Sequence, residues 1–526
     1  MTSMDMENEK GSITVFLSLT GILFLVLIFA ITESARVQGA KAQSANITAM
    51  GTYSLLGEYE QGLLDKFNLF GLDGSYGSGS FQIDKVNERF EKFMAYNTSP
   101  KKDLGLLTLG SFDPWQLTLE DHEIEGYTLL TDGDGAAFYQ EAVTYVKSNA
   151  AYFAINGLLA LKDSFENADE NSEKHDEAES SGKKDLAEAE KAEEERKQKE
   201  KEEAEQAARE AAEQGIILET EPETEEQPKL ENPLGAIADF LGKGVYFVTA
   251  NDLNISKEKF NTNSLPSHTI TNKGTLPVEN KNSGIVSDLC FKAYVLSYLS
   301  DFTSDEKDKG KAVTCQLEYA MWGKNNDRAN VSRALEAILA IREGMNLTYA
   351  IRDEGIQKGC AAISSLVVIA PPVATVLCGV FVVVMSTIES FLDTKALIHG
   401  GRVPFVKTED TWKMSPKQLL HIVEVFKADS SEYDTGLNYR EYLMGIMLLN
   451  PFRSMKKLRL RTLDVIQLEL QKRSGESNFR AQNCIVALKT RASFETGSVF
   501  GRVPQIMLGI SQSSVGFTQK AGMAYW

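Results

Sequence analysis

An uncharged apolar run at residues 12–31 stands almost at the beginning of the chain. A helix of about twenty residues, rising about 1.5 Å per residue, spans a hydrocarbon core of roughly 30 Å. The run is longer than the apolar part of a removable signal peptide, its leader is acidic, and the nearest small-x-small triplet, at residues 40–42, lies well past its end. The pattern therefore predicts an uncleaved transmembrane helix at 12–31 behind a short leader at 1–11.

Beyond this run, apolar residues recur at steps of three and four, which is typical of one face of an α-helix. The predicted packing or assembly face consists of Ala45, Ala49, Tyr53, Leu56, Tyr59, Leu63 and Phe67. Because no proline interrupts residues 12–70, the sequence predicts one continuous helix of about 55 residues and about 80 Å. Its part at 32–73 is expected to form a stalk that packs on the body or on partner proteins.

A small α+β unit is predicted at 74–165, with helices near 81–94 and 136–161 and one or two strands near 115–130. The intervening residues 131–135 (TDGDG) invite a calcium-loop interpretation. They lack an oxygen ligand at Ala136 and a distant bidentate Glu, so a turn and helix start is the better interpretation.

The composition changes at 166–232. Acids, bases and alanines dominate residues 185–213, with Leu186 as their one large aliphatic residue, and i, i+4 charge pairs support a helix without a core. Residues 220–233 are rich in Glu, Thr and Pro and are expected to be disordered. We therefore predict that 166–232 is a charged, solvated linker.

The remainder, 233–526, reads as a mostly helical α+β body. Helices are predicted at 285–299, 327–346, 419–427, 439–449 and 455–472, and strands within 485–494 and 500–525. An uncharged apolar stretch at 359–388 contains Pro371–Pro372 near its middle, and each half is too short to span a bilayer. It predicts a buried helical hairpin at 359–390; the alternative is a kinked or re-entrant second membrane segment.

The net charge and the cysteine content argue against several classes of function. The net charge of −19 offers no basic excess for phosphates, which argues against nucleic-acid binding. The five cysteines are scattered, and no CxxC pair signals a zinc ribbon or a dithiol redox site. Buried free thiols are favoured over a single disulfide.

Recognisable catalytic motifs are missing from the sequence. The five histidines form no HxH or HExxH pattern, His421 with Glu424 is a lone HxxE, and neither a phosphate-binding glycine loop nor a GxSxG elbow occurs. The sequence thus predicts no catalytic, cofactor-binding or metal-binding residue and no cofactor, and we expect a protein that is not an enzyme.

The N-terminus has a familiar pattern. Residues 10–19 (KGSITVFLSL), followed by Glu33-Ser34-Ala35-Arg36, resemble the TadE/TadG-like minor pseudopilins of the tight-adherence (Tad) pilus. The resemblance implies a prepilin-type cut between Gly11 and Ser12. Phe16 stands where pilins carry a Glu that neutralises a neighbouring amino terminus, so an uncut anchor is equally consistent. The resemblance to pseudopilins also implies a cytoplasmic N-terminus and an extracytoplasmic body. The positive charges of Arg36 and Lys41 just after the helix favour the opposite orientation, but only weakly.

Three further motifs resemble the DUF5702 family, which has no established activity and is associated with Tad-type pilus genes. They are residues 389–398 with Gly400, Val403, Pro404, Lys407 and Trp412; residues 437–443; and residues 318–323. Their Trp, Tyr and Leu content favours packing elements over a site.

The functional expectation is a single-pass, membrane-anchored envelope protein. It would act as a minor pseudopilin-like or assembly component of a Tad or type IV-like pilus or secretion system. Its partners would be the lipid bilayer and other pilus or assembly proteins that contact the N-terminal helix. The alternatives are an anchored extracytoplasmic enzyme, such as a cell-wall hydrolase, and a two-pass component of a secretion complex.

Overall fold

The computed structural model describes residues 4–98, 113–149, 161–166, 174–184, 255–304, 313–367, 371–421, 435–449, 455–473, 477–502 and 514–526, with isolated positions between 187 and 206. The chain divides into two compact units. Unit 1 comprises Met1–Ser148, Asn263–Gly284 and Arg459–Trp526, and unit 2 comprises Asn149–Thr262 and Ile285–Leu458. The predicted body at 233–526 is therefore shared between two units, and its last strands belong with the N-terminal helix.

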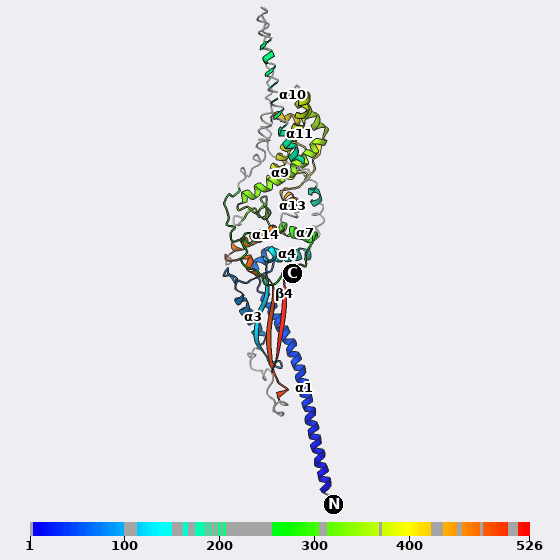
Figure 1. Ribbon diagram of the computed structural model, residues 1–526, viewed down its shortest axis with the longest axis vertical. Helices are drawn as coiled ribbons and strands as arrows, with labels where there is room; N and C mark the ends of the chain where they lie inside the picture. The colour runs from blue at the N-terminus through cyan, green and yellow to red at the C-terminus, as the bar shows by residue number, and fades with distance from the viewer. Residues whose placement is uncertain are drawn as a thin grey trace, which may run out of the picture. The chain divides into compact units, whose positions relative to one another are not determined.

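Helix α1 (Met4–Leu56) opens unit 1 and runs without interruption for 53 residues (Figure 1). The predicted continuation to residue 70 is wrong, because α1 ends at Leu56 and a separate helix, α2, covers Gln61–Phe67. Gly57 follows the last residue of α1, and glycine is a weak helix former. Glu60 then caps α2, since its carboxylate accepts a hydrogen bond from the Gly62 amide at 3.1 Å.

The buried face of α1 is not the one that hydropathy predicted. Ala45, Ala49 and Tyr53 are exposed, and Tyr59 after the helix is exposed as well. Leu56, Leu63 and Phe67 are buried as expected. The face that packs is built largely from small and hydroxyl-bearing residues: Ala40, Ser44, Ile47, Thr48, Gly51, Thr52 and Leu55. Such residues allow close helix–sheet approach, and hydropathy does not mark them as core.

A four-stranded antiparallel sheet forms the other layer of unit 1. Its strands are β1 (Leu72–Asp73), β2 (Leu117–Leu129), β3 (Cys484–Gly497) and β4 (Ser514–Ala524). Strand β3 pairs with all three others, with β2 along most of its length, with β4 from Ala487 onward and with β1 only at its first two residues. The predicted strand at 485–494 is thus confirmed. The core lies between the sheet and helices α1 and α3 (Ile83–Thr98).

Helix α4 (Asp132–Ser148) begins with the glycine-rich turn. Gly133, Asp134 and Gly135 all have positive φ, and Asp132 accepts hydrogen bonds from the amides of Leu129 at 2.6 Å and Gly274 at 2.9 Å. The Asp132 carboxylate is therefore engaged by backbone donors. This confirms the turn and helix start.

Unit 2 is helical in the part of it that the structure describes. Besides the helical residues 161–166 and 174–184, it contains α7 (Ile285–Tyr298), α8 (Gln316–Trp322), α9 (Asp327–Arg352), α10 (Glu354–Val367), α11 (Pro371–Ile398) and α13 (Tyr439–Leu449). The described residues also include the short 3₁₀ helices η3 (Glu409–Thr411) and η4 (Pro416–His421) in this unit and η5 (Ala481–Asn483) in unit 1. Helix α14 (Met455–Gln471) begins in unit 2 and continues into unit 1. The predicted helix at 419–427 falls mostly outside the described residues.

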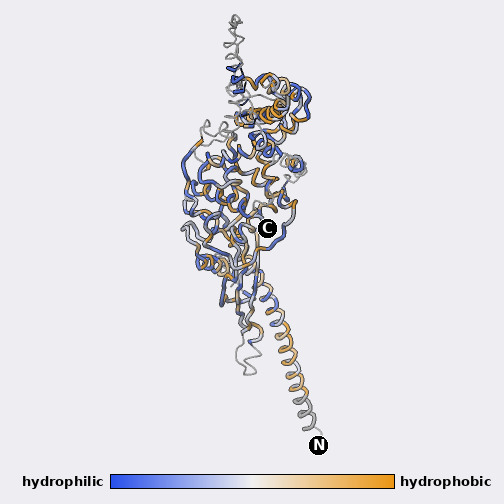
Figure 2. The backbone as a smooth tube through the Cα atoms, turned by 45° about the horizontal axis from the view of Figure 1, so that its top comes forward, coloured by the Kyte–Doolittle hydropathy of each residue, from blue (hydrophilic) through white to orange (hydrophobic). Residues whose placement is uncertain are grey.

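Among the residues that the structure describes, two helices are long and apolar enough to cross a membrane. The first is Ile13–Leu56 within α1, whose most apolar 18-residue window has a mean hydropathy of 2.7 and is 0% buried. The second is Pro372–Ile398 within α11, whose most apolar window has a mean hydropathy of 2.0 and is 78% buried. The second apolar stretch forms α10 and α11, whose side chains share a core with α9. Figure 2 shows the apolar segment of α1 as a continuous hydrophobic stretch.

The acidic segment at 166–232 is not a solvated spacer throughout. Residues 174–184 are helical, His175 is fully buried, and Ala178 packs against the core of α9, α10 and α11. Residues 207–254 lie outside the described part of the chain. The five cysteines are free; four are buried and Cys378 is half-buried, in agreement with the prediction of free thiols.

Candidate functional site

The first candidate is the apolar surface of α1 between Ile13 and Ile31. Nearly all its large apolar side chains are exposed, among them Phe16 at 69% and Leu23 at 71%. The hydroxyls of Ser18, Thr20 and Thr32 donate to carbonyls four residues earlier at 2.6–2.8 Å, so they are satisfied within the helix. A helix without charge and with its hydroxyls internally bonded suits an apolar medium.

The predicted processing junction and the pilin-Glu position lie in this same helix. The backbone of α1 is helical through Gly11 and Ser12, and the side chain of Phe16 belongs to the exposed apolar surface. The structure thus places these three residues on one segment. It places Ala45, Ala49 and Tyr53 on the exposed surface of the packed half of the same helix.

Four residues fix α1 to the sheet where the apolar segment ends; we call Glu33, Arg36, Trp115 and Thr496 the anchor clamp. The buried Arg36 guanidinium bonds the carboxylate of Glu33 at 2.7 Å, the carbonyl of Trp115 at 3.1 Å and the hydroxyl of Thr496 at 2.9 Å. Gly39 completes the fit, because a Cβ there would lie 2.1 Å from the Trp115 ring. The apolar half of α1 is therefore held in a fixed direction by its packed half.

Glu33 also binds the turn after β3. Its carboxylate accepts hydrogen bonds from the amides of Phe500 at 2.8 Å and Val499 at 3.3 Å. Burial raises the pKa of Glu33, but the hydrogen bonds from Arg36 and from the Phe500 amide outweigh it, and the net pKa lies below the usual value. The Glu33 carboxyl therefore stays ionised at neutral pH. The sequence marked residues 33–36 through a resemblance and Arg36 also through the charge bias, but the distant partners of Glu33 and Arg36 left no local signal.

The end of the stalk is tied down by a buried acid. Glu141 of α4 accepts a hydrogen bond from the amide of Phe70, while its second oxygen is buried without a hydrogen-bond partner. Burial raises the pKa of Glu141 to about 8, an effect that the Phe70 amide partly offsets.

This raised pKa makes the stability of unit 1 depend on pH. A folded-state pKa above the unfolded value stabilises the fold fully below about pH 4.5 and loses that contribution as pH rises to about 8. Glu141→Gln keeps an acceptor for Phe70 but cannot ionise, so we expect a smaller fall in unfolding free energy between pH 5 and pH 8. Urea unfolding at both values measures this, with the exposed Glu88→Gln as control; an equal fall in Glu141→Gln and wild type would contradict the assignment.

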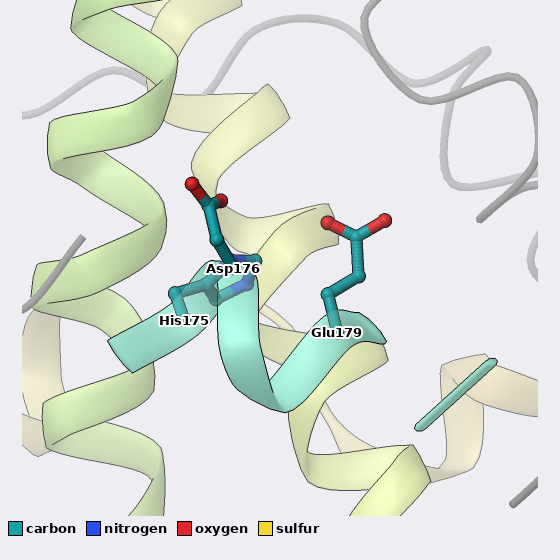
Figure 3. A group of neighbouring side chains, drawn as sticks. All are labelled: His175, Asp176 and Glu179. Atoms are coloured by element: carbon teal, nitrogen blue, oxygen red, sulfur yellow. The ribbon is translucent and has the colours of Figure 1, made fainter. Parts of the chain in front are cut away.

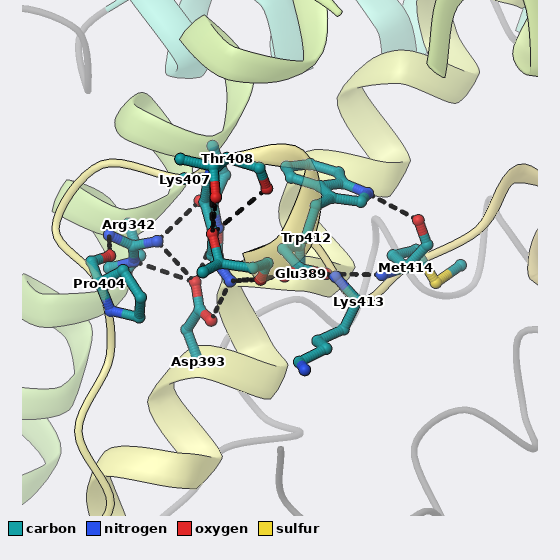
Figure 4. Close-up of polar contacts among 12 residues, drawn as sticks. Arg342, Glu389, Asp393, Pro404, Lys407, Thr408, Trp412, Lys413 and Met414 are labelled. Atoms are coloured by element: carbon teal, nitrogen blue, oxygen red, sulfur yellow. Dashed lines mark hydrogen bonds and ion pairs between the residues drawn. The ribbon is translucent and has the colours of Figure 1, made fainter. Parts of the chain in front are cut away.

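The second candidate is a buried charge cluster in unit 2, formed by Arg342 of α9, Glu389 and Asp393 of α11, and Lys407 (Figure 4). All four side chains are fully buried. The Arg342–Asp393 contact is 2.8 Å, and Lys407 lies 2.6 Å from Glu389 and 2.7 Å from Asp393. Two positive and two negative charges thus balance in the core.

Neutral partners satisfy the rest of the cluster. Arg342 donates to the carbonyls of Pro404 and Phe405 at 3.0 and 2.8 Å, and Glu389 accepts from the Met414 amide at 2.9 Å. Burial raises the pKa of Asp393, but Arg342 and Lys407 outweigh it and hold the net pKa below the usual value. A fully paired network of this kind cross-links α9, α11 and residues 404–414. It leaves no member of the cluster free to act as a general base.

The other two family-like motifs also meet in the core of unit 2. Tyr439 donates its hydroxyl proton to Glu318 at 3.0 Å, and the Phe302 amide donates to the same oxygen at 2.9 Å. Burial raises the pKa of Glu318 to about 7. Arg440, beside Tyr439, forms an ion pair with Asp301. These motifs therefore serve the core through their charged and hydroxyl groups as well as their apolar ones.

The model of DUF5702, a family of unknown function, matches residues 223–496, which is more than half of the chain. The chain belongs to the DUF5702 family. The match includes the buried charge cluster and all of β3 except Gly497, but it does not include α1. No curated protein and no solved structure matches the chain.

Two remaining candidates from the sequence can be placed only in part. The side chain of His421 and the whole of Glu424 lie outside the described residues. Gly400, two residues after the end of α11, has φ of +84° and lies in a turn. The thiols are poor nucleophile candidates, since burial raises the pKa of Cys360 to about 12 and that of Cys484 well above its usual value.

Proposed function

We propose that this DUF5702 protein is a single-pass membrane protein of the cell envelope. It acts as a non-catalytic, pseudopilin-like or assembly component of a Tad or type IV-like pilus or secretion system. Its short N-terminus lies in the cytoplasm and both units lie outside. It assembles with other helical membrane proteins along α1.

The observation that supports this role is the division of α1 into two halves. The half from Ile13 to Ile31 exposes apolar side chains all round, while the half from Arg36 to Leu56 is part of the folded core of unit 1. Burying each exposed Leu, Ile or Phe side chain gains about 1.5–3 kcal/mol. The first half therefore requires lipid or apolar helices around it.

The exposed side of the packed half suits a helical partner. Ala42, Ala45 and Ala49 are exposed there, together with Met50 at 54% and Tyr53 at 68%. Small residues let two helix backbones approach closely, and the flanking Met and Tyr add contact area. This face continues directly from the apolar segment, so one neighbouring helix could follow both halves of α1.

Whether the chain is cut at the Gly11–Ser12 junction distinguishes a pseudopilin from an uncut assembly component. Processing there supports a pseudopilin, and an intact N-terminus supports an uncut assembly component. Phe16 removes the carboxylate that a polymerising pilin uses to neutralise the next amino terminus. The proposal for that reason stops short of a polymerising subunit.

Crosslinking from α1 in native membranes tests the proposal. A photo-crosslinking residue at Ala45 or Ala49 is expected to capture a second membrane-anchored protein, because both positions are exposed on the proposed partner face. The exposed Glu88 of α3 is the matched control and should give no such product. Adducts confined to lipid, or to a second copy of this chain, would count against an assembly role.

A further inference from the structure

Three potential ligand groups of unit 2 gather on one helical turn. His175, Asp176 and Glu179 lie in the helical residues 174–184, and their ligand atoms all fall within 4.8 Å of one another (Figure 3). A cluster of acids on a charged helix is common, so this grouping alone does not define a site. The neighbouring helices supply what distinguishes it.

The distinguishing feature is a buried ring nitrogen without a hydrogen bond. His175 is fully buried; its Nε2 contacts the Thr387 hydroxyl of α11 at 3.2 Å, whereas its Nδ1 has no hydrogen-bond partner. Nδ1 faces the carboxylate of Glu343 on α9, with 3.9 Å between the nitrogen and Oε2. That separation is too long for a hydrogen bond. An unpartnered buried polar atom of this kind calls for an explanation.

A cation bound between the Nδ1 of His175 and the carboxylate of Glu343 would explain the unpartnered nitrogen. Zinc lies about 2.0–2.2 Å from nitrogen and oxygen ligands, which sets two ligand atoms roughly 3–4 Å apart. The distance from Nδ1 to Glu343 falls in this range. A neutral imidazole carries a lone pair on one ring nitrogen, and this lone pair is what a metal ion binds.

The charged groups around Glu343 favour the binding of a cation. Its side chain is 13% exposed, and the carboxylates of Glu179 and Asp176 are the acidic groups near it. Lys183 is a positive group nearby, and it pairs with one oxygen of Glu179 at 2.7 Å. Three ionised carboxylates would carry more negative charge than the single ammonium group of Lys183 balances.

We propose that His175, Asp176, Glu179 and Glu343 bind one divalent transition-metal cation, for which Zn²⁺ is the best-fitting species. One imidazole with carboxylates favours zinc and its first-row neighbours over calcium, which prefers oxygen ligands alone. The ion fastens the first turns of the acidic segment to α9. It serves as a structural fastener and leaves the proposed membrane role unchanged.

Zinc binding by the full chain in detergent tests this site. Wild type is expected to bind one equivalent of Zn²⁺ that survives dialysis, measured by metal analysis and by titration against a chelating dye. Glu343→Gln and Asp176→Asn are each expected to weaken that equivalent by about tenfold or more, since even outer partners of a metal site are worth 10–100-fold. Glu177→Gln, exposed on the same helix and outside the cluster, should bind as wild type does.

A thermal scan separates site binding from adsorption to the acidic segment. Zn²⁺ should raise the unfolding temperature of wild type and of Glu177→Gln but not of Glu343→Gln. The proposal is overturned if wild type retains no zinc. It is equally overturned if the retained zinc is unaffected by Glu343→Gln, or if Glu177→Gln weakens it as strongly as Asp176→Asn does.

Discussion

Lys407→Met is expected to destabilise unit 2 by about 3–5 kcal/mol, the range measured when one partner of a buried ion pair is removed. In wild type, Lys407 contacts both Glu389 and Asp393 in a fully buried setting. The substitution leaves two carboxylates with Arg342 alone, so one negative charge is buried without compensation. Such a loss is a large part of the stability of an ordinary domain.

Urea unfolding followed by tryptophan fluorescence measures this effect. Trp412 lies beside the cluster, with its indole nitrogen 2.6 Å from the carbonyl of Met414. Lys358→Met is the matched control, since Lys358 pairs with Glu354 at the surface and exposed pairs are worth about 0–1 kcal/mol. A second substitution, Glu389→Gln, should restore part of the loss in Lys407→Met by removing the unpaired charge. Equal effects of Lys407→Met and Lys358→Met would contradict a structural role for the cluster.

Local pattern was enough to place the regular elements. The predicted helix at 439–449 coincides with α13, and the strand expected at 485–494 lies within β3. Helix and strand periodicity is a property of consecutive residues, so it can be recognised without knowing which element the helix or strand packs against. The end of α1 was missed because Gly57 and the cap at Glu60 are weak signals beside the absence of proline.

The packed face of α1 could not be read from hydropathy. Thr52, for example, is buried, and its hydroxyl forms a hydrogen bond of 2.7 Å with the hydroxyl of Thr490 in β3, 438 positions further along the chain. Arg36 likewise donates a hydrogen bond to Thr496, 460 positions further along the chain. A long-range hydroxyl or guanidinium contact is set by the tertiary fold, and neither residue looks like core in isolation.

The charge cluster left a faint signal that could have been used. Glu389 and Asp393 follow directly on the uncharged stretch 359–388 and lie four residues apart, which places them on one face of the helix. Two acids in line with a buried apolar face indicate buried partners. Identifying Arg342 and Lys407 as those partners required the arrangement of α9 and α11.

Removing residues 1–31 is expected to release the protein from the membrane without unfolding it. The cut leaves the anchor clamp and the packed face of α1 in place, because Glu33 is the first clamp residue. Removing residues 1–70 should instead prevent unit 1 from folding. That deletion takes Ile47, Leu55 and Leu63 out of the protein core, at about 1.5–3 kcal/mol each, together with the buried Arg36.

The two truncations therefore separate the functions of the two halves of α1. Near-ultraviolet circular dichroism and limited proteolysis report the fold of each. We expect 32–526 to match the full chain in detergent and 71–526 to be aggregated or readily digested. A well-folded 71–526 would show that α1 is dispensable to unit 1.

The most direct single measurement is the sedimentation of residues 32–526 with membranes in the absence of detergent. A single anchor at 13–31, with α11 covered by protein, predicts that 32–526 stays in the supernatant while the full chain sediments. If 32–526 remained in the membrane pellet as a folded protein, a second membrane attachment would be required, and the single-pass assignment would be contradicted.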